Sequence, residues 1–250
     1  MGPIGFLKEK GDSVYHFKLT MVDLFSKDLI KNHIADTIEV GFNQYGHTLA
    51  ISGVLTTRRR VVFVNSITID LIHKNEKKSY IFDWLTFRPH RFNVGGFQGI
   101  DLQMASKFLV TPDEPFQYNI FFSDQANYLK INPVLSIIDN GWEQLMEGKD
   151  PDAKKINHQN LFKQYIEKPM IQEAMKELKK ANYWKSGDYR ITIIVSTRNP
   201  QGQIEYKKSF SLTEEDIRML EQNPLAIAAD LCNQTAIRYN FASVKLEDAG

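Results

Sequence analysis

The chain has 250 residues, of which 42% are hydrophobic and 24% charged, as in an ordinary soluble protein that builds its own core. It carries 31 basic and 30 acidic residues, a formal charge of +1. This balance disfavours nucleic acid or an anionic membrane as the main partner, because those partners select for a basic excess. The single cysteine, Cys232, excludes an internal disulfide and a cysteine-rich zinc site, and its apolar neighbours indicate a small buried side chain.

The sequence shows no sign of membrane insertion or secretion. No apolar run reaches about 18 residues, so no membrane span is expected. The start, MGPIGFLKEKGDS, lacks the long apolar stretch of a signal peptide, and Phe6 stands where the myristoylation pattern needs Ser or Thr. The cytosol is the default expectation, although a chain with its signal already removed would look the same.

The first 35 residues show no single pattern. Within them, residues 14–25 (VYHFKLTMVDLF) fit either an extended segment or a short amphipathic helix. From residue 36 onward, TIEVGFNQYGHTLAISGVLT predicts two strands around a turn at Tyr45-Gly46. In the second strand apolar residues recur at every second position, which is typical of a strand with one buried face.

Further runs in the first half also predict strands. RVVFVNSITIDLIHKN (60–75) and SYIFDWLTFRP (79–89) form a predicted hairpin, and Pro89 ends its second strand. Residues 100–110 predict another strand. FQYNIFFS (116–123) alternates like the half-buried strand of an antiparallel sheet.

The pattern then becomes helical. Asn132 and Pro133 predict a helix start, with asparagine as the N-cap and proline in the first turn, and this helix ends before a polar link at 148–155. Two more helices are predicted, one over 158–168 and one that begins at Pro169. An apolar stripe in the last of these consists of Ile171, Ala174, Met175 and Leu178.

Strands return at residue 187. DYRITIIVSTRN and IEYKKSFSL predict a hairpin around a turn at 199–203. Trp184, Gly187 and Tyr189 have the spacing of a tyrosine corner, in which a tyrosine hydroxyl bonds back to backbone a few residues upstream.

The C-terminal part predicts helices. Thr213-Glu214-Glu215-Asp216 resembles a capping box, and Asn223-Pro224 opens a last helix.

Together these elements predict a mainly β protein with helices, of the α+β class. An isolated hairpin is marginal in water, so the late hairpin must pack on the early strands. We expect an antiparallel immunoglobulin-like β-sandwich with a helical insertion and C-terminal helices. The expected parts are an N-terminal segment (1–35), the β-sandwich (36–124 and 186–212), the helical insertion (125–185), and C-terminal helices and tail (213–250).

The stretch GFNQYGHTLAISGVLTTRRRVVFVNSITIDLIHKN resembles the opening strands of arrestin-like and other immunoglobulin-like sandwiches. The shared pattern is G-x-x-L-x-I-x-G-x-L, followed by a long strand of alternating aliphatic residues. Its fixed positions are Gly46, Leu49, Ile51, Gly53 and Leu55. The pattern covers about a fifth of the chain, and any antiparallel sandwich needs such alternation. The resemblance implies a non-enzymatic adaptor or binding module and assigns no site residue.

One basic cluster lies in FRPHRFNVGGFQG (87–99). Arg88, His90 and Arg91 can bind a phosphate or carboxylate, and Gly95 and Gly96 would let backbone N–H groups approach the same anion. The glycines match neither the P-loop nor the dinucleotide fingerprint, and glycines also serve plain turns. An inter-strand loop that displays contacts is the favoured interpretation.

Two smaller features join this candidate site. Phe92 and Phe97 flank the glycines, and exposed loop aromatics are costly unless they meet a partner. Arg58, Arg59 and Arg60 lie where one predicted strand turns into the next. They are either a charged turn or, if they lie near the first cluster, part of one basic patch.

No catalytic or metal motif is present. The six histidines include no His-Glu-x-x-His pattern, and no Gly-x-Ser-x-Gly occurs. Asp70 and Asp83 lie on the paired strands and could face each other, which is weak support for a glycosidase-type pair. We therefore expect no cofactor and no catalytic residue.

Three hypotheses follow. The first is a non-catalytic protein-interaction module with a protein partner. The second is a receptor or enzyme that binds an anionic small ligand through the 87–99 loop. The third is assembly of copies through the stripe that contains Ile171, for which packing inside the protein is the competing explanation.

Overall fold

The computed structural model describes most of the chain beyond residue 29. The described residues are 30–58, 60–76, 78–87, 91–94, 97–100, 103–112, 114–147, 157–234 and 236–249. For residues 91–94, 97–100 and 103 this description covers the backbone only. The undecided segment 14–25 lies outside the described residues.

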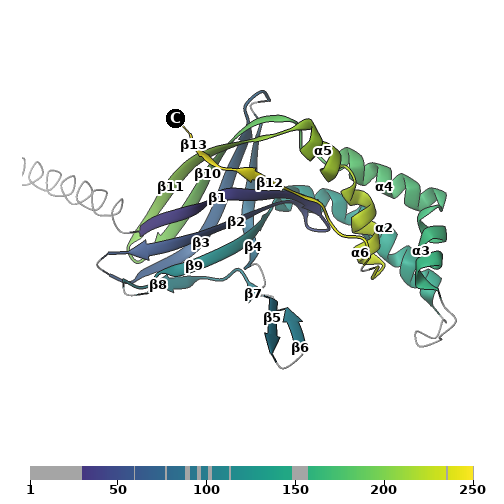
Figure 1. Ribbon diagram of the computed structural model, residues 1–250, viewed down its shortest axis with the longest axis horizontal. Coiled ribbons are helices and arrows are strands. Elements are labelled where there is room, and N and C mark those ends of the chain that lie inside the picture. Colours follow the sequence, from purple (N-terminus) through teal and green to yellow (C-terminus); the bar gives the residue numbers. More distant parts are fainter. Residues whose placement is uncertain are drawn as a thin grey trace, which may run out of the picture.

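The strands form one large antiparallel sheet and a separate hairpin (Figure 1). The order along the sheet is β12-β1-β2-β9-β4-β3-β10-β11-β13, with β7 paired to β4 and β8 paired to β3. The strands of this sheet are β1 (Ile30–Asn43), β2 (Gly46–Thr57), β3 (Val62–His73), β4 (Ser79–Phe87), β7 (Gln103–Met104), β8 (Phe108–Val110), β9 (Phe116–Ser123), β10 (Gly187–Arg198), β11 (Gln201–Leu212), β12 (Phe241–Lys245) and β13 (Glu247–Asp248). The hairpin consists of β5 (Arg91–Val94) and β6 (Phe97–Ile100).

The alternation in the sequence fixes which strand face is buried. In β10 the predicted residues Tyr189, Ile191, Ile193 and Val195 are buried, as is Thr197 on the same face, and the residues between them are at least partly exposed. β9 has the predicted bounds, and the predicted hairpin of β3 and β4 is confirmed. The strand predicted over 100–110 is broken into the short strands β6, β7 and β8.

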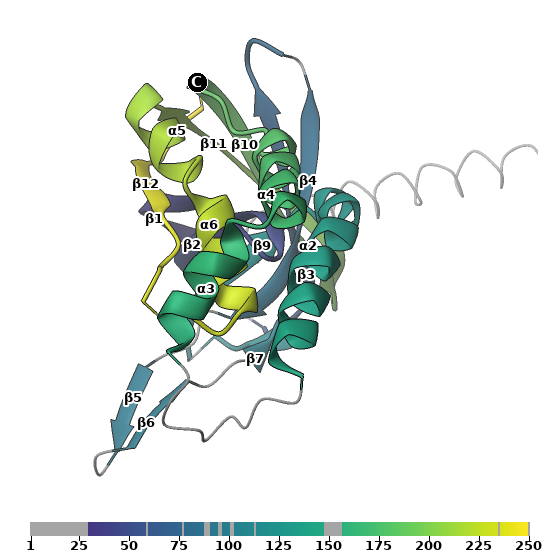
Figure 2. The same cartoon turned by 90° about the vertical axis from the view of Figure 1, so that its right-hand side faces the viewer.

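The mainly antiparallel β architecture with helices is confirmed, but the two facing sheets of a sandwich are not what the strands form. One sheet curls until it nearly closes on itself (Figures 1 and 2). Alternation could not decide between these arrangements. It shows that one face of each strand is buried, and that face can meet a second sheet or the far side of the same sheet.

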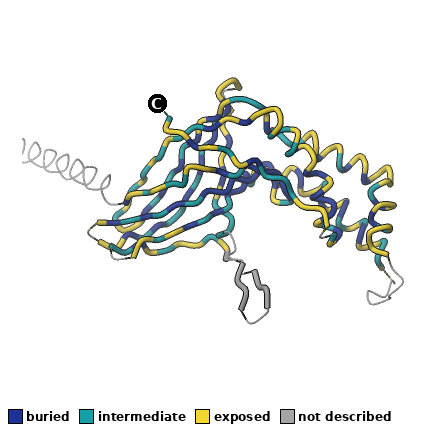
Figure 3. The backbone as a smooth tube through the Cα atoms, viewed as in Figure 1, coloured by how far each residue is buried: buried dark blue, intermediate teal, exposed yellow. Residues whose placement is uncertain are grey.

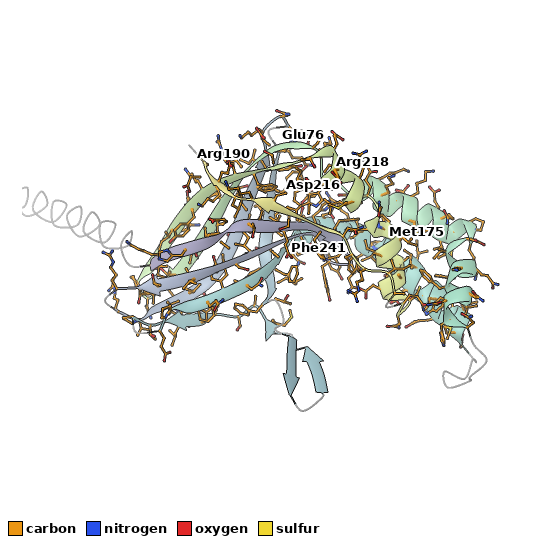
Figure 4. All side chains as sticks on the ribbon, viewed as in Figure 1. Glu76, Met175, Arg190, Asp216, Arg218 and Phe241 are labelled. Carbon is orange, nitrogen blue, oxygen red and sulfur yellow. The ribbon has the colours of Figure 1, made fainter. Side chains whose placement is uncertain are left out.

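The C-terminal residues, predicted as a tail, complete the curl. β12 pairs with β1, and the continuing chain in β13 pairs with β11. Figure 4 labels Phe241, the first residue of β12, near the junction of sheet and helices. Its ring packs so closely on Gly41 of β1 that a Cβ at Gly41 would lie 2.5 Å from the ring. The β1–β12 pairing joins residues about 200 positions apart, so no local sequence pattern predicts it.

The helices gather at one end of the curled sheet (Figures 1 and 2). They are α2 (Gln125–Met146), α3 (His158–Ile166), α4 (Pro169–Ala181), α5 (Glu214–Leu220) and α6 (Asn223–Leu231). Figure 3 shows buried backbone along the strands and continuing into the helical end, so one core serves both. In the described part of the chain, no helix has the length and apolar character needed to cross a bilayer.

α2 begins eight residues before the predicted start. Its N-cap is Asp124, whose carboxylate accepts a hydrogen bond from the Asn127 N–H, and Pro133 lies inside the helix. An aspartate at the end of β9 therefore replaces Asn132 as the helix start. The proline removes one helical hydrogen bond, and its exposed position makes that loss tolerable.

The apolar stripe of α4 packs inside the protein. Ile171, Ala174 and Leu178 are buried, and α4 contacts α2 and α6. The stripe is therefore not available as a contact face between copies, which removes the third hypothesis in that form. Cys232 is likewise buried, as its apolar neighbours indicated.

The tyrosine corner is confirmed. The Tyr189 hydroxyl donates to the Lys185 carbonyl oxygen at 2.9 Å and accepts from the Lys185 N–H at 3.0 Å. This fixes the chain that leads from α4 into β10.

Candidate functional site: the β4 cleft

A cleft of about 610 Å³ lies where the start of β4 meets α2 and α4. We call it the β4 cleft. Its residues come from three elements that are far apart in sequence. They are Lys78, Ser79, Tyr80, Ile81, Asp124, Ala126, Asn127, Lys130, Ile131, Val134, Glu177, Lys180, Ala181 and Tyr183.

Stacked aromatic rings support the cleft from below. The Tyr183 ring stacks on Tyr80, with centroids 4.0 Å apart, and its other face stacks on His47, with centroids 3.4 Å apart. Trp184 adds an edge contact to His47 and donates its indole N–H to the Gly41 carbonyl oxygen at 2.8 Å. The segment after α4 is thereby fixed against β1, β2 and β4.

His47 is completely buried and holds this arrangement by hydrogen bonds. The Tyr183 backbone N–H donates to Nε2 at 2.9 Å, so Nε2 is the acceptor and Nδ1 carries the proton. Nδ1 then donates to the Asn127 side-chain oxygen at 2.8 Å. The Asn182 side-chain oxygen lies 3.1 Å from Nε2 and accepts a hydrogen bond from the Trp184 backbone N–H.

Burial makes His47 a neutral group. Loss of solvent lowers the pKa of His47 to about 3, although the hydrogen bond to Asn127 opposes this shift. The imidazole is therefore uncharged at neutral pH, and both of its nitrogens are already bonded. It is a structural residue at the floor of the cleft and offers neither a proton nor a free lone pair for chemistry.

Asp124 ties the helix to the aromatic stack. One carboxylate oxygen caps α2 through the Asn127 N–H at 3.0 Å, and the other accepts the Tyr183 hydroxyl at 3.0 Å. Burial, and then the negative charge of Asp124, raise the pKa of Tyr183 well above its usual range. The phenol is thus a permanent donor, and it keeps the carboxylate oriented.

Lysines give the cleft its charge. The Lys78 ammonium lies 4.9 Å from the centre of the Tyr80 ring, a cation–π contact, and Lys130 is exposed on α2. Lys180 pairs with Glu177 on α4 at 2.5 Å. Within the described ranges, no salt bridge involves Lys78 or Lys130, so these two exposed lysines and the buried carboxylate of Asp124 are the unpaired charges of the cleft, and the exposed charge is positive.

The floor also includes an open sheet edge. β4 pairs with β3 from Ser79 onward, but its pairing with β9 begins only at Asp83. β9 ends at Ser123 because the chain turns there into α2. In the described part of the chain, no strand pairs with the α2-facing edge of residues 79–82.

The sequence-predicted site lies elsewhere and is only partly visible. Arg88, His90, Gly95, Gly96 and Arg59 lie outside the described residues. Arg91, Phe92 and Phe97 belong to the β5–β6 hairpin, whose backbone alone is described. Arg58 and Arg60 are exposed at the turn from β2 to β3. Whether these groups converge on an anion stays a prediction.

The possible carboxylate pair does not form an obvious acid–base site. Asp70 pairs across the strands with Ile81, and Asp83 pairs with Thr68, so the two aspartates are diagonal neighbours. The Ser79 hydroxyl donates to the Asp70 carboxylate. Among the residues that the structure describes, no three His, Cys, Asp or Glu side chains gather as a metal site would require.

Sequence reasoning missed the β4 cleft. Nothing in the local sequence YGHT shows that the hydrogen-bond partners of His47 come from residues 127 and 182. The one local signal was the aromatic pair Tyr183-Trp184 in the short link between a helix and a strand.

Comparisons with known proteins add little to this geometry. No family model matches the chain, and no curated protein matches it. One solved structure, a family 123 glycoside hydrolase from Clostridium perfringens described for glycolipid glycan hydrolysis, is similar with a TM-score of 0.32 and 11% identity. The match covers 74% of this chain and 27% of that one, so the chain spans about a quarter of its length. At that TM-score the likeness carries no argument about fold or function.

Proposed function

We propose that this protein is a non-catalytic interaction module that binds an extended, acidic and partly apolar segment of a partner protein in the β4 cleft. The observation that carries the proposal is the open edge of residues 79–82 at the floor of the cleft. An exposed strand edge binds extended peptides by β-strand addition, and neighbouring side chains supply specificity.

Side chains around the edge define the chemistry of the partner. Ile81 is 64% exposed beside the open edge, which favours an apolar side chain opposite it. Lys78 and Lys130 flank it with positive charge, which favours acidic side chains on the same segment. The stacked tyrosines give the cleft a rigid base, so little side-chain freedom is lost on binding.

The geometry of the β4 cleft favours binding over catalysis. His47 is neutral, buried and fully bonded, and Asp124 is occupied by the α2 cap and the Tyr183 hydroxyl. A general acid or base needs a free proton site within reach of a substrate. The groups in the cleft that remain exposed are lysines and an isoleucine, which suit recognition.

The resemblance to arrestin-like and immunoglobulin-like proteins supports the same class of function. It rests on the strand pattern of residues 46–55, and the single curled sheet differs from the two-sheet form of those families. We keep it as support for an adaptor role and take no binding residue from it.

Selection from a displayed library of random short peptides tests this function. The full chain is the bait, and Ile81→Arg and Leu109→Arg are compared with the wild type. Leu109 is the matched control because it is 55% exposed on β8, away from the cleft. Circular dichroism establishes that both variants keep the fold.

The expected peptides combine acidic and apolar residues and bind the wild type and Leu109→Arg equally. Ile81→Arg should bind them about tenfold more weakly, a loss of about 1.4 kcal/mol. Failure to enrich any peptide, or equal binding by Ile81→Arg, would show that the cleft is not the binding site.

A further inference from the structure

The curled sheet leaves a gap between its first and last long strands. Residues 30–33 of β1 and 203–207 of β11 line a cavity of about 680 Å³. We call it the β1–β11 seam. It lies at the end of the sheet away from the helices, and the chain enters β1 there at Ile30 (Figure 1).

The C-terminal strand shows how wide the gap is. Beside residues 37–41 of β1 and residues 208–209 of β11, the C-terminal chain fills the gap. There β12 pairs antiparallel with β1, and β13 pairs antiparallel with β11. The Leu246 N–H donates to the Asp36 carbonyl oxygen at 2.8 Å, and the next residue, Glu247, pairs with Ser209. The space between β1 and β11 thus has the width of one strand, and this filling ends at Lys207, which accepts the Ala249 N–H at 3.4 Å.

Beyond that point, among the described residues, a side chain crosses the gap. The Tyr206 hydroxyl donates to the Ile30 carbonyl oxygen at 3.2 Å, a backbone group that a neighbouring strand would otherwise bind. Burial raises the pKa of Tyr206 to about 12, opposed by a hydrogen bond with the Asn32 backbone. The Asn32 side-chain nitrogen is buried without a partner among the described residues.

The residues on the two edges of the seam require an occupant whose side chains alternate between apolar and polar. On the inner face, Ile30 is buried, and Ile34 and Ile204 pack partly buried against the core. On the outer face, the residues between them are exposed and polar, as Lys31 and Glu205 show. A strand that fills the seam must therefore turn apolar side chains inward at every second position and polar ones outward.

We propose that residues 15–21 of this chain occupy the seam as a strand antiparallel to β1. This segment lies outside the described residues, and its sequence, YHFKLTM, alternates apolar and polar residues throughout. Tyr15, Phe17, Leu19 and Met21 would face inward, and His16, Lys18 and Thr20 outward. The seam is open along β1 over the five residues 30–34, so the seven alternating residues are long enough to span it.

Connectivity favours this occupant over a separate partner. Residues 22–29 join the segment directly to Ile30, which itself lines the seam. A tethered segment has a high effective concentration at a neighbouring site. An antiparallel hairpin with β1 also gives the segment the same direction as the C-terminal strand that fills the rest of the gap.

Disulfide trapping in the full chain tests the proposal. Thr20→Cys and Lys18→Cys, each combined with His33→Cys on the outer face of β1, cover two registers of the inserted strand. Cys232 remains in place because it is buried, and burial raises its pKa to about 12, which suppresses its reactivity. Thr20→Cys with Glu173→Cys on exposed α4 is the matched control.

The expected result is an intramolecular disulfide in at least one of the two seam pairs and none in the control. Crosslinks that form only between molecules would assign the seam to a second copy and overturn the proposal. Absence of any crosslink, or equal crosslinking in the control, would overturn it as well.

Hydrogen exchange gives a second readout. Leu19→Asp places a charge on the proposed inner face, and Thr20→Asp is the control on the outer face. The amides of residues 30–34 should lose protection in Leu19→Asp and keep it in Thr20→Asp, while β10 stays protected in both. Equal protection in the two variants would contradict insertion of the segment.

Discussion

The Tyr183 ring stacks on the His47 ring with 3.4 Å between centroids, and the Tyr183 backbone N–H donates to Nε2 of that same imidazole. One residue thus uses both its ring and its backbone to hold a neutral histidine. Since Tyr183 also donates its hydroxyl to Asp124, the strand hairpin of β1 and β2, the start of α2 and the end of α4 meet at this pair. The base of the β4 cleft depends on it.

The first prediction concerns pH. The pKa of His47 is about 3 in the folded protein and 6.5 in the unfolded chain, because burial disfavours the charged form. Below pH 6.5 the unfolded chain therefore binds a proton that the folded protein does not. The free energy of unfolding should fall as the pH falls from 6.5 towards 3, by up to about 1.4 kcal/mol per pH unit from this group, and be unaffected by it above pH 6.5.

Urea unfolding at several pH values between 5 and 7 measures this slope. His47→Gln removes the titrating group and should flatten the dependence while lowering stability. His33→Gln, at an exposed position on β1, is the control and should keep the wild-type slope. A wild-type slope retained by His47→Gln would refute the assignment.

The second prediction concerns Asp124. Asp124→Ala removes the cap of α2 and leaves the Tyr183 hydroxyl without its acceptor in a buried place. Loss of a cap costs about 1 kcal/mol, and an unpaired buried hydroxyl costs about 1–3 kcal/mol, so a loss of about 2–4 kcal/mol is expected. Urea unfolding provides the measurement.

Two variants separate the two contributions. Asn157→Ala removes the cap of α3 at an exposed site and should cost only about 1 kcal/mol. Asp124→Asn keeps one acceptor oxygen for the Asn127 N–H, and its amide N–H can donate to the Tyr183 hydroxyl oxygen, so it should cost less than Asp124→Ala. Equal losses in Asp124→Ala and Asn157→Ala would mean that the Tyr183 contact contributes nothing.

The strands could be predicted because their burial is periodic. β9 has the predicted bounds and β10 differs from the predicted segment by one residue at each end, since each alternates residues such as Ile120 and Ile193 on a single buried face. The Thr213 capping box and the Tyr189 corner are local patterns, and both are confirmed. Features of this kind are set by residues within a few positions of one another.

The closure of the sheet and the β4 cleft could not be predicted because their contacts are distant in sequence. β1 pairs with β12 through Ile38 and Val244, and His47 meets Asn127 and Asn182 across many intervening residues. A two-residue N-cap pattern at Asn132 also misplaced the start of α2. The basic cluster at 87–99 could be selected from the sequence because its arginines, histidine and glycines suggest anion binding. The lysines of the β4 cleft are common surface residues, and their role depends on their position in the fold.

The third prediction concerns the charge of the cleft. Lys78→Glu with Lys130→Glu reverses the positive charges that the proposed partner segment would meet. Peptides selected on the wild type should bind this variant more weakly, and the difference should shrink at high salt because exposed charges are screened. Binding by fluorescence anisotropy across a salt series provides the measurement.

Lys107→Glu with Lys163→Glu makes the same change in net charge at exposed positions outside the cleft. This control should bind like the wild type. If both double variants lose binding equally, net charge and not the cleft is responsible.

The fourth prediction concerns Gly141 inside α2. Alanine is the better helix former by about 1 kcal/mol, so an open position would be stabilised by Gly141→Ala. Here a Cβ would lie 2.6 Å from the Tyr165 hydroxyl oxygen, while the next nearest atoms are 3.6 Å away. That hydroxyl donates to the Ile138 carbonyl oxygen in the buried contact between α2 and α3, so it is held in place and Gly141→Ala should destabilise the protein.

Removal of the obstructing atom should reverse the sign. In a Tyr165→Phe background the alanine Cβ loses its one close contact, and the helix preference of alanine should then dominate. A double-mutant cycle measured by urea unfolding therefore gives a destabilising Gly141→Ala in the wild type and a neutral or stabilising one with Tyr165→Phe. The same loss in both backgrounds would show that the Tyr165 hydroxyl is not what requires glycine at this position.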